Sequence, residues 1–375
     1  MSSLTPELLD RIRSRAAGYD RDNVFFTEDL DELRAAGYLA PRSLLETARD
    51  QRLLAAYAPA TALGINMHLV WTGVARVLSE RGDHSLDWVL KDAEAGELFA
   101  FGNSEGGNDL VLWDSLTTAD AVDGGFAFTG TKIFTSLAPA WTRLGIFGKQ
   151  SDGPEGPRLV HGFLTRETAA TPVEGVTTLD DWDTLGMRAT QSNTTRLDHA
   201  LVATDHVTRF LPVGPNADPF VFGIFANFLL LIGSVYAGIA DRALELGVEA
   251  AQKRTSLKNG GATYAQDPDI RWRLADAALA LDALRPDLET LTADVDNLVN
   301  HGGDWFRYLT GAKHRATETA RYVVDQAMRV AGGGGYRSAS ELARLQRDVL
   351  AGIYHPSDTE SLHSTVATNL LGPLS

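Results

Sequence analysis

The chain of 375 residues has no cysteine and few methionines. Without cysteine it has no disulfide, thiolate nucleophile or cysteine-ligated metal, and redox chemistry does not reveal its compartment. The nine histidines are scattered and never fall at HExxH spacing, and neither a P-loop nor a strand-linked GxGxxG is present. No metal site is therefore predicted, and longer sequence patterns must carry the function.

Basic residues are in the minority, with 34 Lys and Arg against 49 Asp and Glu and a formal net charge of −15. This balance argues against binding to a nucleic-acid backbone, although local basic residues could still hold a small anion. The N-terminus lacks the apolar core of a signal peptide. The longest apolar run, near residues 225–238, is too short and interrupted for a membrane span. We therefore expect a cytoplasmic protein without nucleic-acid or membrane partners.

Hydrophobic periodicity divides the chain into three parts. Residues 1–96 have apolar side chains at helical spacing, with helix starts such as Thr5-Pro6. Residues 97–212 are rich in glycine and alternate polar with apolar positions, which is typical of short strands. Long apolar helical patterns then return. We predict an α+β fold with an N-terminal helical domain (1–96), a middle β-barrel or sandwich (97–212) and a C-terminal helical bundle (213–375).

Three longer stretches carry residue types suited to holding a cofactor. In "FGNSEGGNDLVLW" (101–113) with "TGTKIFTS" (129–136), a Gly-Gly pair lets the backbone approach a planar ligand and the strand end offers hydroxyls. "WDTLGMRATQSNT" (182–194) directs polar side chains from a turn. "VAGGGGYRSASELARLQRDV" (330–349) has four glycines where a helix cap needs one, which suits packing against a pyrophosphate. An ordinary barrel loop, a solvated loop and a flexible hinge are the respective alternatives.

These stretches, together with "YAGIADRALELGVEAAQKRTS" (236–256), follow one another as in acyl-CoA dehydrogenases, and nearly the whole chain resembles that superfamily. The resemblance implies a helical N-terminal domain, a middle β-barrel and a C-terminal four-helix bundle. It also implies a flavin, FAD or FMN, between the barrel and the bundle, in a homodimer or homotetramer.

The resemblance assigns cofactor contacts by position. The residues that flank the flavin ring and its N5 would be Phe134, Thr135 and Ser136. The loop over the ring would contain Glu105 and Gly106. The phosphates would be contacted, from a neighbouring subunit, by Arg254, Gly332, Gly333, Gly334 and Gly335. After the arginine this chain reads "RTSLK" where Lys-Thr-Phe-Gly is usual, which keeps FMN open beside FAD.

The catalytic base of an acyl-CoA dehydrogenase is missing from both of its usual positions. That glutamate removes the α-proton of the substrate, and where it would follow the Arg-Asp pair this chain has Pro356 next to His355. The other position corresponds to residues 228–229, which are apolar. Asp358 or Glu360 could replace it, although a Ser-Asp-Thr-Glu run is typical of a helix start. An acyl-CoA dehydrogenase or oxidase with a relocated base therefore stays as the alternative function.

Another branch of the superfamily, the two-component flavin monooxygenases resembling dibenzothiophene monooxygenase, also lacks this glutamate. They receive reduced flavin from a separate reductase and use O₂ to oxygenate an aromatic, sulfur or nitrogen centre. The matching loop makes His355 the catalytic proton donor, since histidine titrates near neutral pH. Ser136 would also be catalytic, because it and Thr135 could hydrogen-bond the flavin N5 or the peroxide. His68 is similar to a catalytic histidine in a helix of that branch, and a buried core histidine is the alternative.

Apolar side chains are predicted to form the substrate wall, and the candidates are Phe228, Leu229 and Trp71. Such a wall suits a neutral hydrophobic or aromatic small molecule and excludes water, while plain core packing is the alternative. The sequence thus predicts a flavin-dependent monooxygenase with a small-molecule substrate and a separate flavin reductase as partners.

Overall fold

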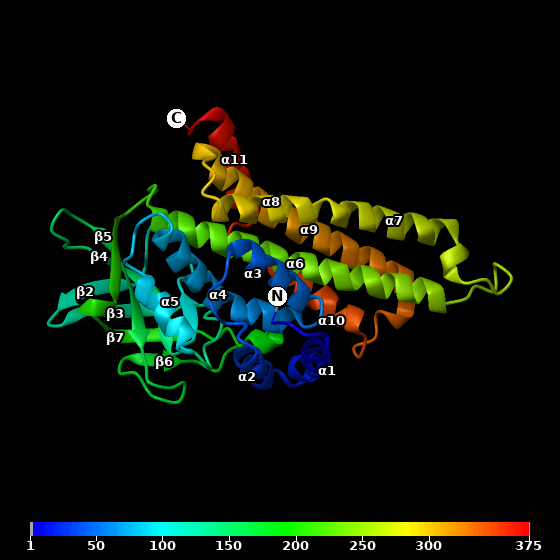
Figure 1. Ribbon diagram of the computed structural model, residues 1–375, viewed down its shortest axis with the longest axis horizontal. Helices are drawn as coiled ribbons and strands as arrows, with labels where there is room; N and C mark the ends of the chain where they lie inside the picture. The colour runs from blue at the N-terminus through cyan, green and yellow to red at the C-terminus, as the bar shows by residue number, and fades with distance from the viewer. Residues whose placement is uncertain (1–2, 375) are drawn as a thin grey trace.

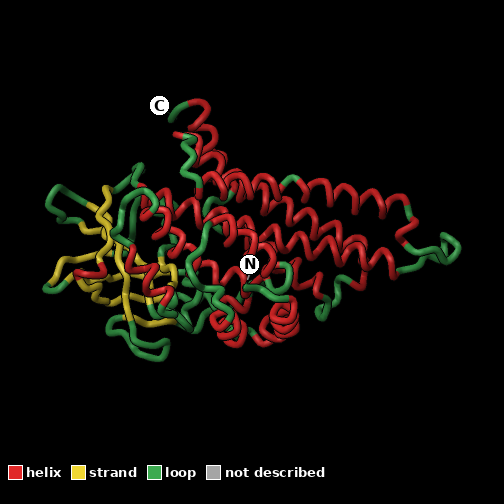
Figure 2. The backbone as a smooth tube through the Cα atoms, in the orientation of Figure 1, coloured by secondary structure: helices red, strands yellow, loops and turns green. Residues whose placement is uncertain are grey.

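The computed structural model describes residues 3–374, and the chain begins with helices. Figure 1 and Figure 2 show these helices packed between a β-sheet and a set of long C-terminal helices. Local sequence explains where the first one starts, because Thr5 accepts a hydrogen bond from the Leu8 N–H at 3.3 Å and Pro6 follows as the first helical residue. The helices are α1 (Pro6–Asp22), α2 (Thr27–Ala35), α3 (Leu44–Ala55), α4 (Pro59–Ser79) and α5 (Asp87–Glu94).

The strands form one sheet in the order β6-β7-β3-β2-β4-β5-β8, and β1 pairs in parallel with β4. The β2–β3 hairpin turns at Gly124, whose φ of +83° favours glycine. The sheet curls so that β5 packs against β7, as a barrel-like middle region requires. The strands are β1 (Phe99–Gly102), β2 (Thr118–Val122), β3 (Gly125–Lys132), β4 (Arg143–Gln150), β5 (Arg158–Thr165), β6 (Val176–Thr178), β7 (Thr195–Ala203) and β8 (Val207–Pro212).

The C-terminal part is a bundle of long helices that extends away from the sheet (Figure 1). Helix α6 (Pro219–Lys253) packs along α9 (Trp305–Ala331), and α7 (Pro268–Asp282) and α8 (Leu284–Asp296) lie against both. The bundle is completed by α10 (Glu341–Asp348) and by α11 (Thr359–Leu371), which packs on α9 and projects from the molecule.

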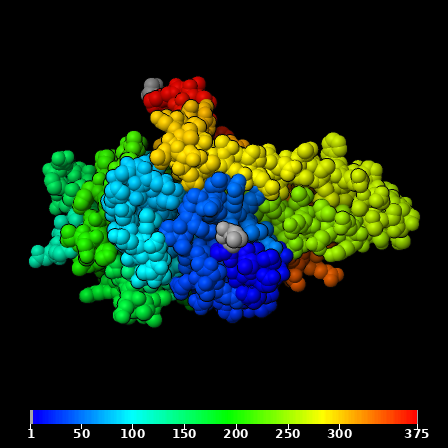
Figure 3. Space-filling model, viewed as in Figure 1, coloured from blue at the N-terminus to red at the C-terminus, as the bar shows by residue number. Residues whose placement is uncertain are grey.

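A single hydrophobic core joins the three parts. Helix α4 is buried along nearly its whole length and packs on α6 and on β1. On the face shown in Figure 3 the N-terminal helices lie between the sheet and the far end of the bundle. The predicted α+β class, with helical ends and a middle sheet, is confirmed. The domain boundaries stay a prediction, because α3 and α4 share their core with α6.

Helix α6 corrects the expectation drawn from the apolar run near residues 225–238. The run is part of a helix of 35 residues that by length and composition could cross a membrane. Within the protein, 83% of its most apolar window is buried. That burial is what the central helix of a packed core requires, so the hydrophobicity of α6 has a structural explanation.

Candidate active site

A cleft of about 320 Å³ opens where the sheet, α4, α6 and the chain after α10 meet. Its walls are mostly apolar. The sheet side contributes Phe101, Ser104, Phe134 and Ser136, and the segment between β6 and β7 contributes Trp182, Thr184, Leu185, Gly186, Met187, Thr190 and Ser192. The helices contribute Leu63, Met67 and Phe228, and the floor is formed by Arg347, Leu350, Ala351, Ile353, Tyr354, His355 and Pro356.

The predicted flavin-flanking segment lies at this cleft. Phe134 has a left-handed φ of +55°, is 52% exposed, and meets the Trp182 ring edge-on at 6.0 Å between centroids. Ser136 is buried beside it. Thr135, between them, is also buried, and its hydroxyl has no hydrogen-bond partner within residues 3–374. The structure therefore places two of the three predicted residues, Phe134 and Ser136, in the cleft wall.

Ser136 belongs to a chain of hydroxyl groups in which the donor of each hydrogen bond can be assigned. The Ser192 hydroxyl donates to the Thr190 hydroxyl at 2.9 Å, and the Thr190 hydroxyl donates to the carbonyl of Met187 at 2.9 Å. Ser136 and Ser192 are 2.7 Å apart. Each hydroxyl has one proton, so Ser136 must donate to Ser192. Ser136 Oγ is then left as an acceptor in the cleft wall.

The Arg-Asp pair at the end of α10 holds the opposite wall. The Asp348 carboxylate accepts the Met187 N–H at 2.6 Å, and Arg347 donates to the Leu185 carbonyl at 2.9 Å. Burial raises the pKa of Asp348 to about 6. Glycine at position 186 allows this close approach of the two segments, because a Cβ there would lie 2.3 Å from the Arg347 carbonyl oxygen. The predicted turn at residues 182–194 is thus a clamped wall of the cleft.

His355 lies in the cleft floor, as predicted, but in an unexpected protonation state. Its Nε2 lies 2.9 Å from the Tyr236 hydroxyl. Burial, with Lys313 adding a like charge, lowers the pKa of His355 to about 3. The ring is therefore neutral at pH 7. The expectation that it titrates near neutral pH is wrong, because a positive imidazolium would lose hydration beside an ammonium group.

Lys313 on α9 lies under the cleft floor and is not among the residues predicted from the sequence. It is 3% exposed, and its Nζ donates to the carbonyls of Gly352, His355 and Ser357 at 2.8–3.0 Å. Burial lowers its pKa to about 8. In an amphipathic helix a lysine is ordinarily taken as a surface residue, so the sequence offers no signal for this contact.

Three predicted site residues lie in the core instead of the cleft. Both ring nitrogens of His68 bind backbone, with Nε2 at 2.9 Å from the Leu39 carbonyl and Nδ1 accepting the Phe99 N–H at 3.2 Å. Trp71 donates to the Ala100 carbonyl at 2.9 Å and packs among aromatic rings. Leu229 is fully buried. None of the three lines the cleft, so the structure does not support their predicted catalytic and substrate-binding roles, whereas the neighbouring Phe228 does line it.

Glu105, predicted to lie in the loop over the flavin ring, is buried and forms an ion pair instead of lining the cleft. Its carboxylate is 1% exposed and pairs with buried Lys132 at 2.6 Å. Burial alone would raise the pKa of Glu105, but Lys132 and the donated hydrogen bonds lower it to about 2. The remaining donors are Asn108, Ser115, Leu116 and Thr117. Gly106 is exposed. Neither residue lines the cleft, so a contact with the ring is not supported.

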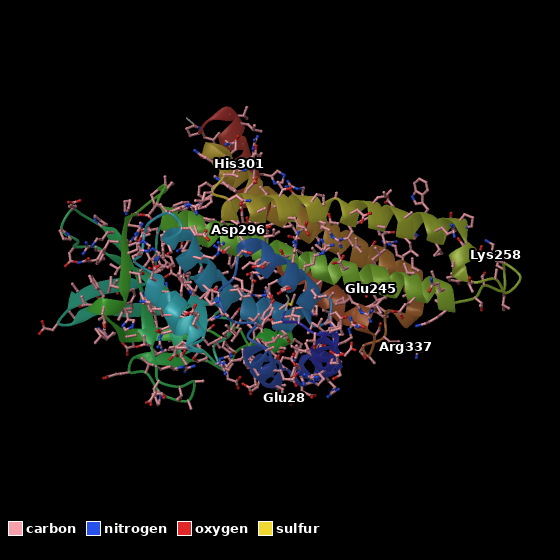
Figure 4. All side chains as sticks on the ribbon, in the orientation of Figure 1. Glu28, Glu245, Lys258, Asp296, His301 and Arg337 are labelled. Atoms are coloured by element: carbon pink, nitrogen blue, oxygen red, sulfur yellow. The ribbon has the colours of Figure 1, made fainter. Side chains whose placement is uncertain are left out.

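Arg254 and the glycine run come together, but far from the cleft. Arg254 donates to the Val330 carbonyl, and a Cβ on Gly332 would lie 2.9 Å from its guanidinium. From Phe228 to Arg254 the chain follows α6 and its cap, about 39 Å at 1.5 Å per residue. The nearby Lys258 and Arg337 lie toward the end of the bundle remote from the sheet (Figure 4).

Two acids that could replace the missing base belong to a helix start. Asp358 accepts the Ser361 N–H at 2.8 Å and caps α11, and this bond lowers the pKa of its carboxyl group. Glu360 is exposed in the first turn of the same helix. Neither contributes to the cleft lining. Their arrangement agrees with the capping interpretation.

Buried polar atoms without partners give a test of whether a flavin fits. Asn103 is 2% exposed, and neither its amide nitrogen nor its amide oxygen has a partner within the described residues. The same holds for the Thr135 hydroxyl. Each adjoins a cleft-lining residue in the chain, Ser104 or Ser136. An unpaired buried polar group costs about 1–3 kcal/mol, so these atoms mark a polar layer behind the cleft wall. The cleft lining itself offers a flavin ring the Ser104 and Ser136 hydroxyls and the aromatic rings of Phe134 and Trp182, which fits such a ligand. The sequence reading did not single out Asn103.

The pentapeptide Gly102–Gly106 has the letters of a GxSxG nucleophile elbow. In such an elbow the serine sits on a turn from a strand into a helix. Here the segment leaves β1, and the next regular element is the strand β2. The geometry of an elbow is therefore not formed, and Ser104 is better explained as part of the cleft wall.

Comparisons with known proteins agree with this architecture. Residues 230–357 match the family model described as "Acyl-CoA dehydrogenase, C-terminal domain". L-evernosamine nitrososynthase of Micromonospora is 26% identical over 92% of this chain and 83% of that protein. Dibenzothiophene monooxygenase of Mycolicibacterium goodii is 30% identical over 68% of this chain and 63% of that protein. The crystal structure of KijD3 with FMN and a dTDP-linked amino keto sugar superposes with a TM-score of 0.83, at 26% identity, covering 98% of this chain and 92% of that one.

Proposed function

We propose that this chain, which resembles the acyl-CoA dehydrogenase family over residues 230–357 and is similar to dibenzothiophene monooxygenase, is a flavin-dependent monooxygenase that acts on a small hydrophobic or aromatic molecule. The observation that carries this proposal is the cleft lining. Within residues 3–374 the lining consists of apolar side chains, hydroxyls, Arg347 and a neutral His355, and every Asp and Glu lies elsewhere. Proton abstraction from an acyl-CoA needs a carboxylate at the reacting carbon.

The cofactor that the relatives support is FMN or FAD, with KijD3 solved in complex with FMN. The residues that would hold its ring are those of the Phe134–Ser136 segment, facing Trp182 and Phe228 across the cleft. When bound and reduced, the flavin supplies the activation of O₂. Ser136 Oγ offers an acceptor to an N–H of the reduced ring.

The other lining residues serve the substrate. Phe228 stacks on Phe101 at 5.9 Å, and with Met67 and Leu63 they give an apolar wall. Such a wall binds a hydrophobic substrate by burying its surface, and it excludes water from the reacting centre. His355 remains neutral, so it can donate or accept one hydrogen bond in the floor without bringing a charge into the cleft.

The wider setting is part of the same proposal. A separate reductase supplies the reduced flavin, and the enzyme works in the cytoplasm. It is a homodimer or homotetramer, in which Arg254 and the Gly332–Gly335 run reach the flavin phosphate of another subunit. The distance of about 39 Å along α6 supports this arrangement, since these residues cannot serve the cleft of their own chain.

The test supplies reduced FMN from a flavin reductase and NADH, with dibenzothiophene as a first aromatic probe and ¹⁸O₂ as oxidant. The expected result is a product that carries one ¹⁸O atom, with formation reduced at least tenfold in His355→Ala. The rival function, an acyl-CoA dehydrogenase or oxidase that uses Asp358 or Glu360, predicts a different outcome. Oxidised flavin on the protein would then lose its colour with an acyl-CoA in the absence of O₂, and Asp358→Asn or Glu360→Gln would abolish the effect.

A further inference from the structure

The ammonium group of Lys313 holds the backbone of the cleft floor. It lies on α9 and is buried, yet its Nζ has no carboxylate within ion-pair distance in the described part of the chain. Its three donors go to three carbonyls of one short segment, those of Gly352, His355 and Ser357. An ammonium group has three protons, so all of them are used on this segment.

A buried charge with only neutral partners is costly unless its hydrogen bonds are complete. Here the charge-assisted bonds offset that cost, and they do so only while the segment keeps its present shape. An ordinary hydrophobic residue at this position would fill the same space without fixing any carbonyl. Lys313 therefore selects one conformation of the segment that carries His355.

Tyr236 holds the ring of the same histidine from the other side. It lies on α6, is fully buried, and its hydroxyl is 2.9 Å from His355 Nε2. His355 is the partner that the structure shows for this hydroxyl among residues 3–374. A buried phenol that does not donate its proton leaves the O–H unsatisfied. The favoured arrangement is thus Tyr236 O–H donating to Nε2, which places the ring proton of the neutral histidine on Nδ1.

We propose that Lys313 and Tyr236 are positioning residues for His355. Lys313 fixes the backbone of residues 352–357, and Tyr236 fixes the ring orientation and its Nδ1–H tautomer. The cleft then receives a neutral N–H donor at a set place. The catalytic value of this arrangement rests on the proposed function, whereas the tautomer and the loop geometry are properties of the chain alone.

The tautomer is tested without flavin by ¹⁵N NMR of histidine-labelled protein, with the His355 signal assigned from His355→Asn. In the wild type we expect His355 mainly as the Nδ1–H form, and in Tyr236→Phe a mixture or the Nε2–H form. Tyr322→Phe, which removes a hydroxyl bound to Asp276 on the surface, is the control and should change nothing. A wild-type Nε2–H tautomer, or an unchanged spectrum in Tyr236→Phe, overturns the proposal.

The role of Lys313 is tested by amide hydrogen exchange of residues 352–357. Exchange in Lys313→Met should rise by about tenfold or more while the helices of the bundle stay protected. The control is Lys253→Met, since Lys253 is an exposed partner of Glu249 on α6. Unchanged exchange of this segment in Lys313→Met refutes the role of Lys313 in fixing the backbone of residues 352–357. If Lys313→Met does not fold, Tyr236→Phe still decides the inference.

A double-mutant cycle links the geometry to turnover. Tyr236→Phe should lower product formation by roughly 2- to 10-fold, the range for loss of one hydrogen bond, and should add nothing in a His355→Ala background. Independent effects of the two substitutions would show that Tyr236 acts other than through His355. Absence of any oxygenated product would refute the proposed function while leaving the NMR result to stand.

Discussion

The buried pair of Glu105 and Lys132 gives the sharpest prediction about the barrel. Glu105→Gln removes the charge but keeps the size, leaving the Lys132 ammonium unpaired in a site where both side chains are at most 1% exposed. The N–H groups of Leu116 and Thr117 donate to different oxygens of the carboxylate, so the new amide NH₂ must face one of these two donors. Breaking one partner of a buried pair costs about 3–5 kcal/mol. We expect the free energy of unfolding to fall by that amount.

The assay is urea unfolding followed by circular dichroism, with FMN affinity measured on the folded protein. Because Glu105 does not line the cleft, FMN affinity should change less than about twofold, well under the 1.4 kcal/mol that a tenfold change represents. Glu105→Gln combined with Lys132→Met removes both charges and should recover part of the loss. An unchanged stability with a tenfold weaker FMN affinity would refute the structural role and restore the flavin contact predicted from sequence.

Acid should reproduce the same loss in the unmodified protein. The pKa of Glu105 is lowered to about 2 in the fold from an ordinary 4.5. Its contribution to stability is therefore complete above pH 4.5 and is lost as the pH falls toward 2. The Glu105→Gln protein should show a smaller decline over that range, and an equal decline in both proteins would contradict the assignment.

Three further predictions concern the cleft. Ser136→Ala should weaken binding of reduced FMN by roughly 2- to 10-fold, as loss of one acceptor implies, with little effect on stability; equal binding by fluorescence titration would contradict it. Phe228→Ala should reduce substrate affinity. Leu229 is the next residue on α6 and is fully buried, so Leu229→Ala should cost about 2–5 kcal/mol of stability without a specific effect on affinity. The reverse pattern in urea melts and binding assays would show that Leu229, and not Phe228, contacts the substrate. The pKa of Asp348 is raised to about 6, so its contribution to stability is greatest at low pH and is lost as the pH rises from about 4 through 6. Asp348→Asn should flatten that part of the curve of stability against pH. An unaltered curve would contradict the raised pKa of Asp348.

Local sequence determined the elements of the fold and their order. The Thr5-Pro6 start, the glycine turn at Gly124 and the Asp358 cap act through neighbours a few residues away, so the pattern alone is enough to place them. The resemblance to acyl-CoA dehydrogenases, carried by motifs in order, is confirmed by the comparisons, as is the flavin-dependent oxidoreductase class. Proline at position 356, with His355 beside it in the cleft floor, was also readable from the sequence.

Tertiary structure decided which polar residues belong to the site. His68 and Glu105 carry side chains typical of catalytic groups, but their partners, the Leu39 carbonyl and Lys132, lie 29 and 27 residues away along the chain. Lys313 looks like a surface lysine until α9 brings it under residues 352–357. The charge state of His355 depends on burial and on that ammonium group. Such contacts join segments that only packing brings together, so periodicity and motif spacing cannot specify them.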